Sequence, residues 1–136
     1  MPVYLTSSFV FDDAEEMRAA FADELERPIY SRFTNPNVSE LVDRLCAMEG
    51  AEAGHATASG MAAVFATFAA LCGAGDHILS GREVFGATHT LLTKVLPRFD
   101  IGHSFVDLED LDSWAGQVTS KTKLIYVETP TNPGVD

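Results

Sequence analysis

The sequence predicts an α/β fold with a mostly parallel sheet, preceded by an extended N-terminal arm. Helical and strand patterns alternate after residue 38, which is typical of a parallel sheet with crossover helices. The segment 123–127 is apolar on both faces, as strands covered by helices on both sides are. Residues 1–38 follow neither pattern. We therefore predict an arm over residues 1–38 and the first part of a larger, incomplete domain over residues 39–136.

The arm combines extended apolar pieces with a stretch broken by prolines. A helix is expected between Asp13 and Leu25, where apolar residues recur every four positions. Pro28 and Pro36 interrupt the stretch that follows, because proline lacks an N–H and denies the helical conformation to the residue before it. The arm is rich in aromatic side chains, so we expect it to lie against another surface.

Residues 39–73 predict two helices joined by a turn. Ser39 is the expected N-cap of the first helix, which ends near Gly50. A short strand over 54–58 is expected to lead into the turn at Ser59-Gly60. The helix after this turn has apolar residues at the i, i+3, i+4, i+7 spacing of a buried face. These residues are Met61, Val64, Phe65, Phe68 and Leu71.

The rest of the chain continues the alternation. The expected elements are strands at 77–79, 105–106 and 123–127 and helices over 88–96 and 108–114. Proline removes a backbone donor and collides with the preceding turn, so Pro97 is expected to stop the helix before it.

The composition excludes several classes of protein. The chain has 136 residues, of which 46% are hydrophobic and 21% charged, so a buried core is possible. A formal net charge of -11 opposes binding to nucleic acid or anionic lipid. Two cysteines make no disulfide framework, and the apolar stretches are too short to span a bilayer. We expect a cytoplasmic protein with no nucleic-acid or membrane partner.

The turn Ser59-Gly60-Met61 is the first candidate for a ligand site. A turn that opens a helix presents free N–H groups and the positive end of the helix dipole, which suits a phosphate. The alternative is an ordinary turn in which Ser59 caps the helix. The phosphate-loop patterns GxxxxGK[ST] and GxGxxG are both absent.

Tyr30 and Arg32 form a second candidate. They are two residues apart in a segment expected to be extended, so their side chains should project to the same side. A phenol beside a guanidinium can clamp a phosphate or a carboxylate. An interface pair that packs the arm down is an equally good interpretation.

Two loops that follow predicted strands form the third candidate. Phe85 can stack on a flat ligand, because open α/β sheets bind ligands beyond the carboxyl ends of their strands. Glu128 and Asn132 lie in a proline-stiffened loop after the last strand, where both can hydrogen-bond a ligand. The alternatives are a core position for Phe85 and a rigid turn with a solvated carboxylate for Glu128.

Metal and hydrolase sites find no support in the pattern of residues. The four histidines lie on separate elements with no HExxH spacing, and no GxSxG motif is present. We therefore predict that the protein binds no metal.

Taken in order, four motifs are similar to those of a known enzyme family. They are Tyr-Ser-Arg, Ala-Ser-Gly-Met, Phe-Gly-Ala-Thr and Glu-Thr-Pro-Thr-Asn-Pro. Together they resemble the Cys/Met metabolism (trans-sulfuration) family of pyridoxal-phosphate-dependent enzymes. The resemblance runs from Pro2 to Pro133 and covers the N-terminal arm and the first part of the large cofactor domain, well under half of a family chain. It implies fold type I, the aspartate-aminotransferase-like architecture of pyridoxal-phosphate transferases.

The resemblance implies roles for the candidate residues toward the cofactor phosphate. Ser59, Gly60 and Met61 would hold the phosphate of pyridoxal 5′-phosphate through the backbone. Tyr30 and Arg32 would reach that phosphate from a neighbouring subunit. A homo-oligomer, a tetramer built from dimers, is therefore expected.

Toward the cofactor ring, the resemblance implies that Phe85 stacks on the pyridine. Asn132 would lie near the ring hydroxyl, and Glu128 would support the same loop. Most family members carry Tyr where Phe85 stands, and its hydroxyl takes part in proton transfer during γ-elimination. The Schiff-base lysine is missing: Lys94, Lys121 and Lys123 do not match it, so no catalytic residue is assigned in this chain.

Phe followed by Gly and a small residue is most similar to the O-succinylhomoserine sulfhydrylase branch. The expected activity of the intact protein is γ-replacement on O-succinylhomoserine or O-acetylhomoserine by sulfide, giving homocysteine. Cystathionine γ-synthase, cystathionine lyase and methionine γ-lyase are the alternatives within the family. An alternative of another class is a non-catalytic fragment, because the 136-residue chain has no Schiff-base lysine and is expected to be inactive by itself.

Overall fold

A computed structural model describes residues 2–131 and 134–135 of the chain. The chain divides into two compact units, Met1–Ala56 (unit 1) and Thr57–Asp136 (unit 2). The division groups residues 39–56 with the arm, whereas the sequence patterns predict a boundary after residue 38. The predicted role of residues 1–38 in contacts between subunits stays a prediction.

Unit 1 contains an extended arm and two helices, α1 (Ala14–Phe21) and α2 (Pro36–Glu49). The arm doubles back on itself: Ser8 forms an antiparallel bridge with Tyr30, and the Ser31 N–H donates to the Ser7 carbonyl at 2.8 Å. Among the described residues of unit 1, Ala20 is the only buried hydrophobic residue. The expectation that the arm lies against another surface stays a prediction.

Both helices of unit 1 differ from their predicted limits. α1 begins after its N-cap Asp13 but ends at Phe21 instead of Leu25, because Asp23 adopts a left-handed conformation at φ 57°. α2 begins at Pro36, so the prediction of Ser39 as its N-cap is wrong. The Asn35 side chain accepts from the Asn37 N–H at 2.9 Å, and proline suits the first helical position because its φ is preset. The predicted end at Gly50 is confirmed.

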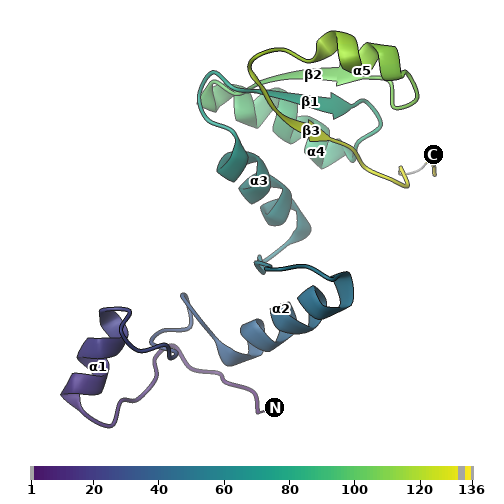
Figure 1. Cartoon of the computed structure of the whole chain (residues 1–136). Coiled ribbons are helices and arrows are strands. Elements are labelled where there is room, and N and C mark those ends of the chain that lie inside the picture. Colours follow the sequence, from purple (N-terminus) through teal and green to yellow (C-terminus); the bar gives the residue numbers. More distant parts are fainter. Residues whose placement is uncertain (1, 132–133, 136) are drawn as a thin grey trace. The chain divides into compact units, whose positions relative to one another are not determined.

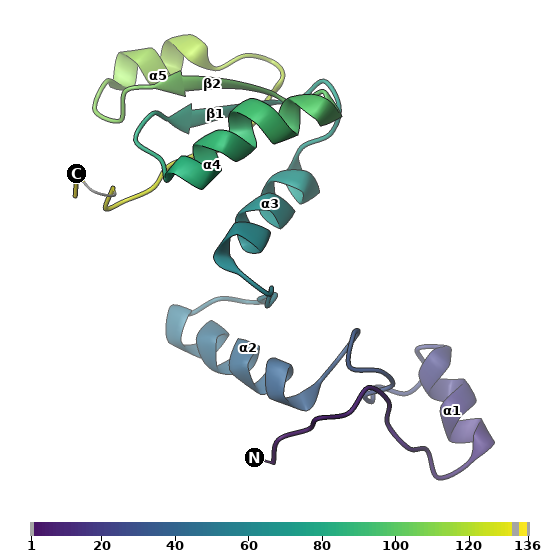
Figure 2. The ribbon, with the colours of Figure 1, turned by 180° about the vertical axis from the view of Figure 1, so that it is seen from behind.

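Unit 2 is built on a three-stranded parallel sheet in the order β2-β1-β3. Its strands are β1 (His77–Gly81), β2 (Gly102–Val106) and β3 (Thr122–Tyr126), so the predicted parallel sheet is confirmed. Figures 1 and 2 show the sheet from its two sides, with α4 and α5 on opposite faces. The helices are α3 (Gly60–Leu71), α4 (Gly86–Thr90) with the π-helix η1 (Leu91–Val95) and the 3₁₀ helix η2 (Leu96–Phe99), and α5 (Leu111–Gln117).

The core of unit 2 lies between the sheet and the helices α3, α4, η1 and η2. Its buried members are Phe68, Cys72, Ile78, Leu91, Leu92, Leu96 and Ile101. Within α3 only Phe68 is buried, whereas Phe65 and Leu71 are exposed, so the predicted buried face is realised only in part. Burial raises the pKa of the Cys72 thiol above its usual value, which keeps this core residue protonated.

Three further local predictions are wrong. Residues 54–58 form no strand. The helical segment does not stop at Pro97. It runs from Gly86 to Phe99, because a change from α to π to 3₁₀ winding places Pro97 where its missing N–H is not needed. The acidic helix begins at Leu111 instead of Leu108, since the Asp110 carboxylate caps it by accepting from the Ser113 N–H at 3.0 Å.

Candidate cofactor site

The N-terminus of α3 presents two free backbone donors. The Ser59 hydroxyl accepts from the Ala62 N–H at 3.2 Å, and the Ser59 carbonyl accepts from the Ala63 N–H at 3.1 Å. Within the described part of the chain, the N–H groups of Gly60 and Met61 have no acceptor. Ser59 is therefore the helix cap, as the simpler interpretation required. The two remaining donors at the positive end of a 12-residue helix suit an anion such as a phosphate.

Gly60 leaves room for a ligand beside these donors. A Cβ atom built on Gly60 has no atom of the described residues within 4 Å, and its φ angle lies outside the left-handed region. Neither the backbone conformation nor the packing of this chain requires a glycine at this position. The open space beside two free N–H groups fits the phosphate group of the predicted cofactor.

Phe85 and Glu128 are brought together, although 43 residues separate them. The Glu128 carboxylate accepts the Phe85 N–H at 2.7 Å, the Thr88 hydroxyl at 3.1 Å and the Tyr126 hydroxyl at 3.0 Å. The Phe85 side chain is 50% exposed, so the prediction that it is available for stacking stays open and a core position is excluded in this structure. Glu128 is engaged with protein donors and is not a solvated carboxylate.

Thr88 and Tyr126, which donate to Glu128, were not predicted from the sequence. Thr88 is 1% exposed, and the Tyr126 ring packs edge-on against Phe68 with centroids 5.0 Å apart. Burial, followed by the hydrogen bond to Glu128, raises the pKa of the Tyr126 phenol, which stays a donor at neutral pH. The only signal in the sequence was their position: Tyr126 lies two residues before Glu128, and Thr88 three after Phe85.

Two further observations concern Met61, near the start of α3, and the lysines at the start of β3. The Met61 side chain packs against the same core as Tyr126. Lys121 and Lys123 lie at the start of β3, whereas Glu128 follows the end of this strand. These two lysines therefore lie at the N-terminal end of the strand, whereas Phe85 and Glu128 lie beyond the C-terminal ends of β1 and β3.

Tyr30 and Arg32 are adjacent in unit 1, but not through an extended backbone. Residues 31–33 form a turn in which the Phe33 N–H donates to the Tyr30 carbonyl at 2.9 Å. The Arg32 guanidinium lies 5.4 Å from the centroid of the Tyr30 ring and 5.0 Å from that of Phe33. Among the described residues, no carboxylate pairs with Arg32. The guanidinium is exposed and has charge to offer a ligand.

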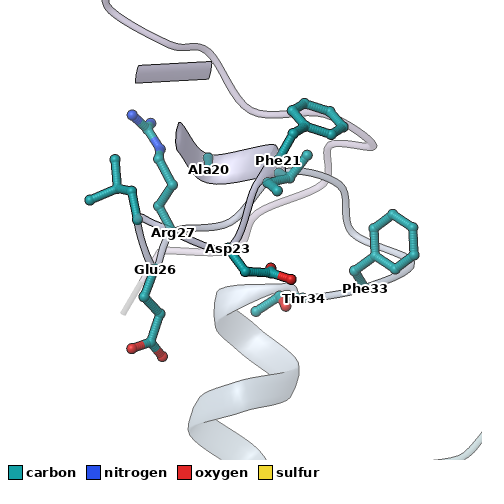
Figure 3. Close-up of a pocket in the computed structure, with 9 residues that line it drawn as sticks. Ala20, Phe21, Asp23, Glu26, Arg27, Phe33 and Thr34 are labelled. Atoms are coloured by element: carbon teal, nitrogen blue, oxygen red, sulfur yellow. The ribbon is translucent and has the colours of Figure 1, made fainter. Parts of the chain in front are cut away.

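Unit 1 also contains pockets. One of about 400 Å³ is lined by Tyr30 and Arg32 together with aromatic residues of the arm. A second, of about 450 Å³, lies beside α1, and its lining includes Phe21, Phe33, Glu26 and Arg27 (Figure 3). No predicted cofactor residue lines this second pocket.

Three further predictions concern Asn132, a metal site and a membrane partner. Asn132 lies outside the described residues. Within the described ranges, no three His, Cys, Asp or Glu side chains are grouped so that they could hold a metal ion. No helix of the described chain has the length and apolar character needed to cross a membrane.

The chain is similar to known enzymes of sulfur amino-acid metabolism. It is 45% identical over 131 residues to an O-succinylhomoserine sulfhydrylase from Pseudomonas aeruginosa, covering 96% of this chain and 32% of that protein. It is 39% identical to an L-methionine gamma-lyase from Fusobacterium nucleatum, covering 99% of this chain and 34% of the relative. The chain thus spans about a third of the length of these curated relatives.

A solved structure agrees with these relatives. A Campylobacter jejuni protein whose crystal structure contains a pyridoxyl-lysine phosphate matches with a TM-score of 0.91 and 33% identity, over 100% of this chain and 34% of that one. This match confirms the predicted fold, the first part of a fold type I enzyme. The profile of the family described as Cys/Met metabolism PLP-dependent enzyme matches residues 1–136. The chain therefore belongs to the Cys/Met metabolism family of enzymes that depend on pyridoxal phosphate.

Proposed function

We propose that the intact protein is an O-succinylhomoserine or O-acetylhomoserine sulfhydrylase that makes homocysteine by γ-replacement with sulfide. The observation that carries the proposal is Phe85 in the loop after β1, where most family members have tyrosine. The similarity to the Pseudomonas sulfhydrylase supports the same assignment.

The residues of this chain bind and orient the cofactor in this proposal. Pyridoxal phosphate, when bound, serves as the electron sink for proton removal from the substrate. The N–H groups of Gly60 and Met61, beside the Ser59 cap, hold its phosphate. The Phe85 ring stacks on its pyridine, and Asn132 would lie near the ring hydroxyl, as the resemblance to the family implies.

Two residues of the arm complete the phosphate site from another subunit. The exposed Arg32 guanidinium, with Tyr30 beside it, binds the phosphate of the neighbouring chain in a homo-oligomer, a tetramer built from dimers. An arm with almost no buried apolar residue of its own is suited to such a role. The substrate is a small amino acid.

The missing hydroxyl of Phe85 gives the proposal a chemical basis. A tyrosine at this position would supply an acid or base next to the substrate, which elimination uses. Phenylalanine keeps the flat ring and removes that group. Replacement by an added nucleophile is therefore favoured over elimination.

The proposal is tested with the full-length protein, pyridoxal phosphate and four substrates. We expect homocysteine from O-succinylhomoserine or O-acetylhomoserine with sulfide, and little keto acid from cystathionine or methionine. The Phe85→Tyr variant should raise the share of elimination product. Identical product ratios in the two proteins would show that the hydroxyl is immaterial.

A second candidate is methionine γ-lyase or another lyase of the family, favoured by the 39% identity to the Fusobacterium enzyme. Release of keto acid from methionine faster than formation of homocysteine would select it.

A candidate of another class is a non-catalytic fragment. The mass of the natively expressed protein after borohydride reduction with pyridoxal phosphate decides this question. A mass near 14.7 kDa with no pyridoxyl adduct would support the fragment, and a larger chain with one adduct would support the enzyme.

A further inference from the structure

The Glu128 cluster consists of the Glu128 carboxylate and its three donors: the Phe85 N–H and the hydroxyls of Thr88 and Tyr126. The distances are 2.7, 3.1 and 3.0 Å. A carboxylate offers about four acceptor positions, so most of the capacity of Glu128 is used by the protein itself. The cluster joins the end of β3 to the beginning of α4.

Both ends of the cluster are anchored in the core of unit 2. Thr88 is buried in the first turn of the α4 helix. Tyr126 packs edge-on against the buried ring of Phe68. The carboxylate is thus held between two side chains that the core keeps in place.

One of the donors of the cluster is the main-chain N–H of Phe85, at 2.7 Å from Glu128. Phe85 is the residue that precedes α4, and no side chain of its own helix caps this end. The Glu128 carboxylate takes that role, and a negative charge at a helix N-terminus is favourable. The Phe85 side chain is 50% exposed, and Glu128 holds the backbone from which it projects.

We propose that Glu128 is a positioning residue: through the Phe85 N–H and the hydroxyls of Thr88 and Tyr126, it sets the orientation of the ring that stacks on the cofactor. Glu128 does this without touching the cofactor. This inference rests on the cofactor site of the proposed function.

The test compares variants of the full-length protein by their dissociation constant for pyridoxal phosphate and by the visible circular dichroism of the bound cofactor. Removing hydrogen bonds to a charged acceptor in Glu128→Ala should raise the dissociation constant about tenfold and change the dichroism. In Glu128→Gln, the amide oxygen can accept the Phe85 N–H while its NH₂ donates to the two hydroxyls. This variant should stay within about threefold of the natural protein, since the bonds are kept.

Two further variants keep the test decisive if Glu128→Ala does not fold. Thr88→Val and Tyr126→Phe each remove one hydroxyl while preserving the shape of the side chain, and each should shift the dichroism in the same direction. The matched control is Glu109→Ala, which removes an exposed carboxylate of unit 2 outside the cluster. It should change neither quantity.

A purely structural role would lower thermal stability in these variants and leave the cofactor signal unchanged. Unchanged dichroism and affinity in Glu128→Ala, or in both hydroxyl variants, would overturn the inference. The proposed function fails differently: the natural protein would bind the cofactor and make no homocysteine, while the comparison among variants would still be measurable.

Discussion

Position 60 is a glycine, although the backbone conformation there does not require one. The space that a Cβ would fill is open, and the φ angle is one that any residue adopts. A substitution at this position can therefore change ligand binding without changing the fold. The space beside the free N–H groups of Gly60 and Met61 would be reduced by any larger residue.

Substitutions at Gly60 should therefore affect the cofactor and spare the fold. We expect Gly60→Asp to stabilise α3 slightly, by up to about 1 kcal/mol, because an acid at a helix N-terminus interacts well with the dipole. The same carboxylate repels a phosphate and should abolish retention of pyridoxal phosphate. Thermal unfolding and cofactor content of the full-length protein measure the two effects. A variant that keeps its cofactor would contradict the phosphate assignment.

Among the elements of unit 1, α1 and the extended arm are connected by Arg27. Its guanidinium pairs with Glu16, donates to the Val10 carbonyl at 2.7 Å and lies 4.7 Å from the centroid of the Phe11 ring. This pair is half-buried, whereas the pair between Arg44 and Glu40 on α2 has an exposed arginine. Exposed pairs contribute little to stability.

Loss of the Arg27 side chain should loosen α1 locally. We expect hydrogen exchange in α1 to accelerate roughly tenfold in Arg27→Ala, since several bonds to a charged group disappear together. Arg44→Ala is the matched control and should leave exchange in α2 nearly unchanged. Equal effects of the two substitutions would mean that the contacts of Arg27 do not hold the helix.

The strand β2 should respond to pH through His103. Its ring lies edge-on to Phe105 with centroids 5.2 Å apart. Burial, and then the charges of His77 and His89, lower the pKa of His103 below its usual 6.5. In the window below 6.5 the unfolded chain therefore binds the proton more readily than the folded one. The contribution of His103 to the free energy of unfolding is therefore fully present above about pH 6.5, and it decreases as the pH falls below this value.

The expected loss is less than about 1 kcal/mol, because the ring keeps part of its solvent contact. His103→Asn removes the titrating group and should flatten the dependence of unfolding free energy on pH between about 5 and 7. Denaturant unfolding at several pH values measures it. The same slope in both proteins would assign the pH dependence to other groups.

At the scale of the whole molecule, the proposed exchange of arms between subunits has a direct test. Arg32→Ala should weaken retention of pyridoxal phosphate, and Gly60→Asp should prevent it. If Arg32 serves the neighbouring chain, a dimer containing one copy of each variant has one site with both defects and one with neither. Random mixing should then restore about a quarter of the sites, since half of the dimers are mixed. Cofactor content of co-expressed chains measures it, and no recovery would mean that both residues act on the same site within one chain.

The sequence by itself determined the parallel sheet, the helix after Ser59 and the family, because these depend on periodic apolar patterns and short motifs. Predicted helix limits were wrong where a neighbouring residue formed the N-cap or where the helix changed from α to another helical conformation. Asn35 displaced Ser39 at the start of α2, and the π and 3₁₀ turns accommodated Pro97. Tyr30 and Arg32 were predicted to be adjacent through an extended segment and are adjacent through a turn.

Only the tertiary structure decided which side chains support the candidate site. Glu128 meets Phe85 across 43 residues because β1 and β3 are neighbours in the sheet, and the order β2-β1-β3 cannot be read from any local pattern. Thr88 and Tyr126 carried no motif of their own. The pairing of β1 with β3 brings the Glu128 acceptor within 3.1 Å of the Thr88 hydroxyl, whereas Tyr126 lies only two residues before Glu128 and donates to it at 3.0 Å.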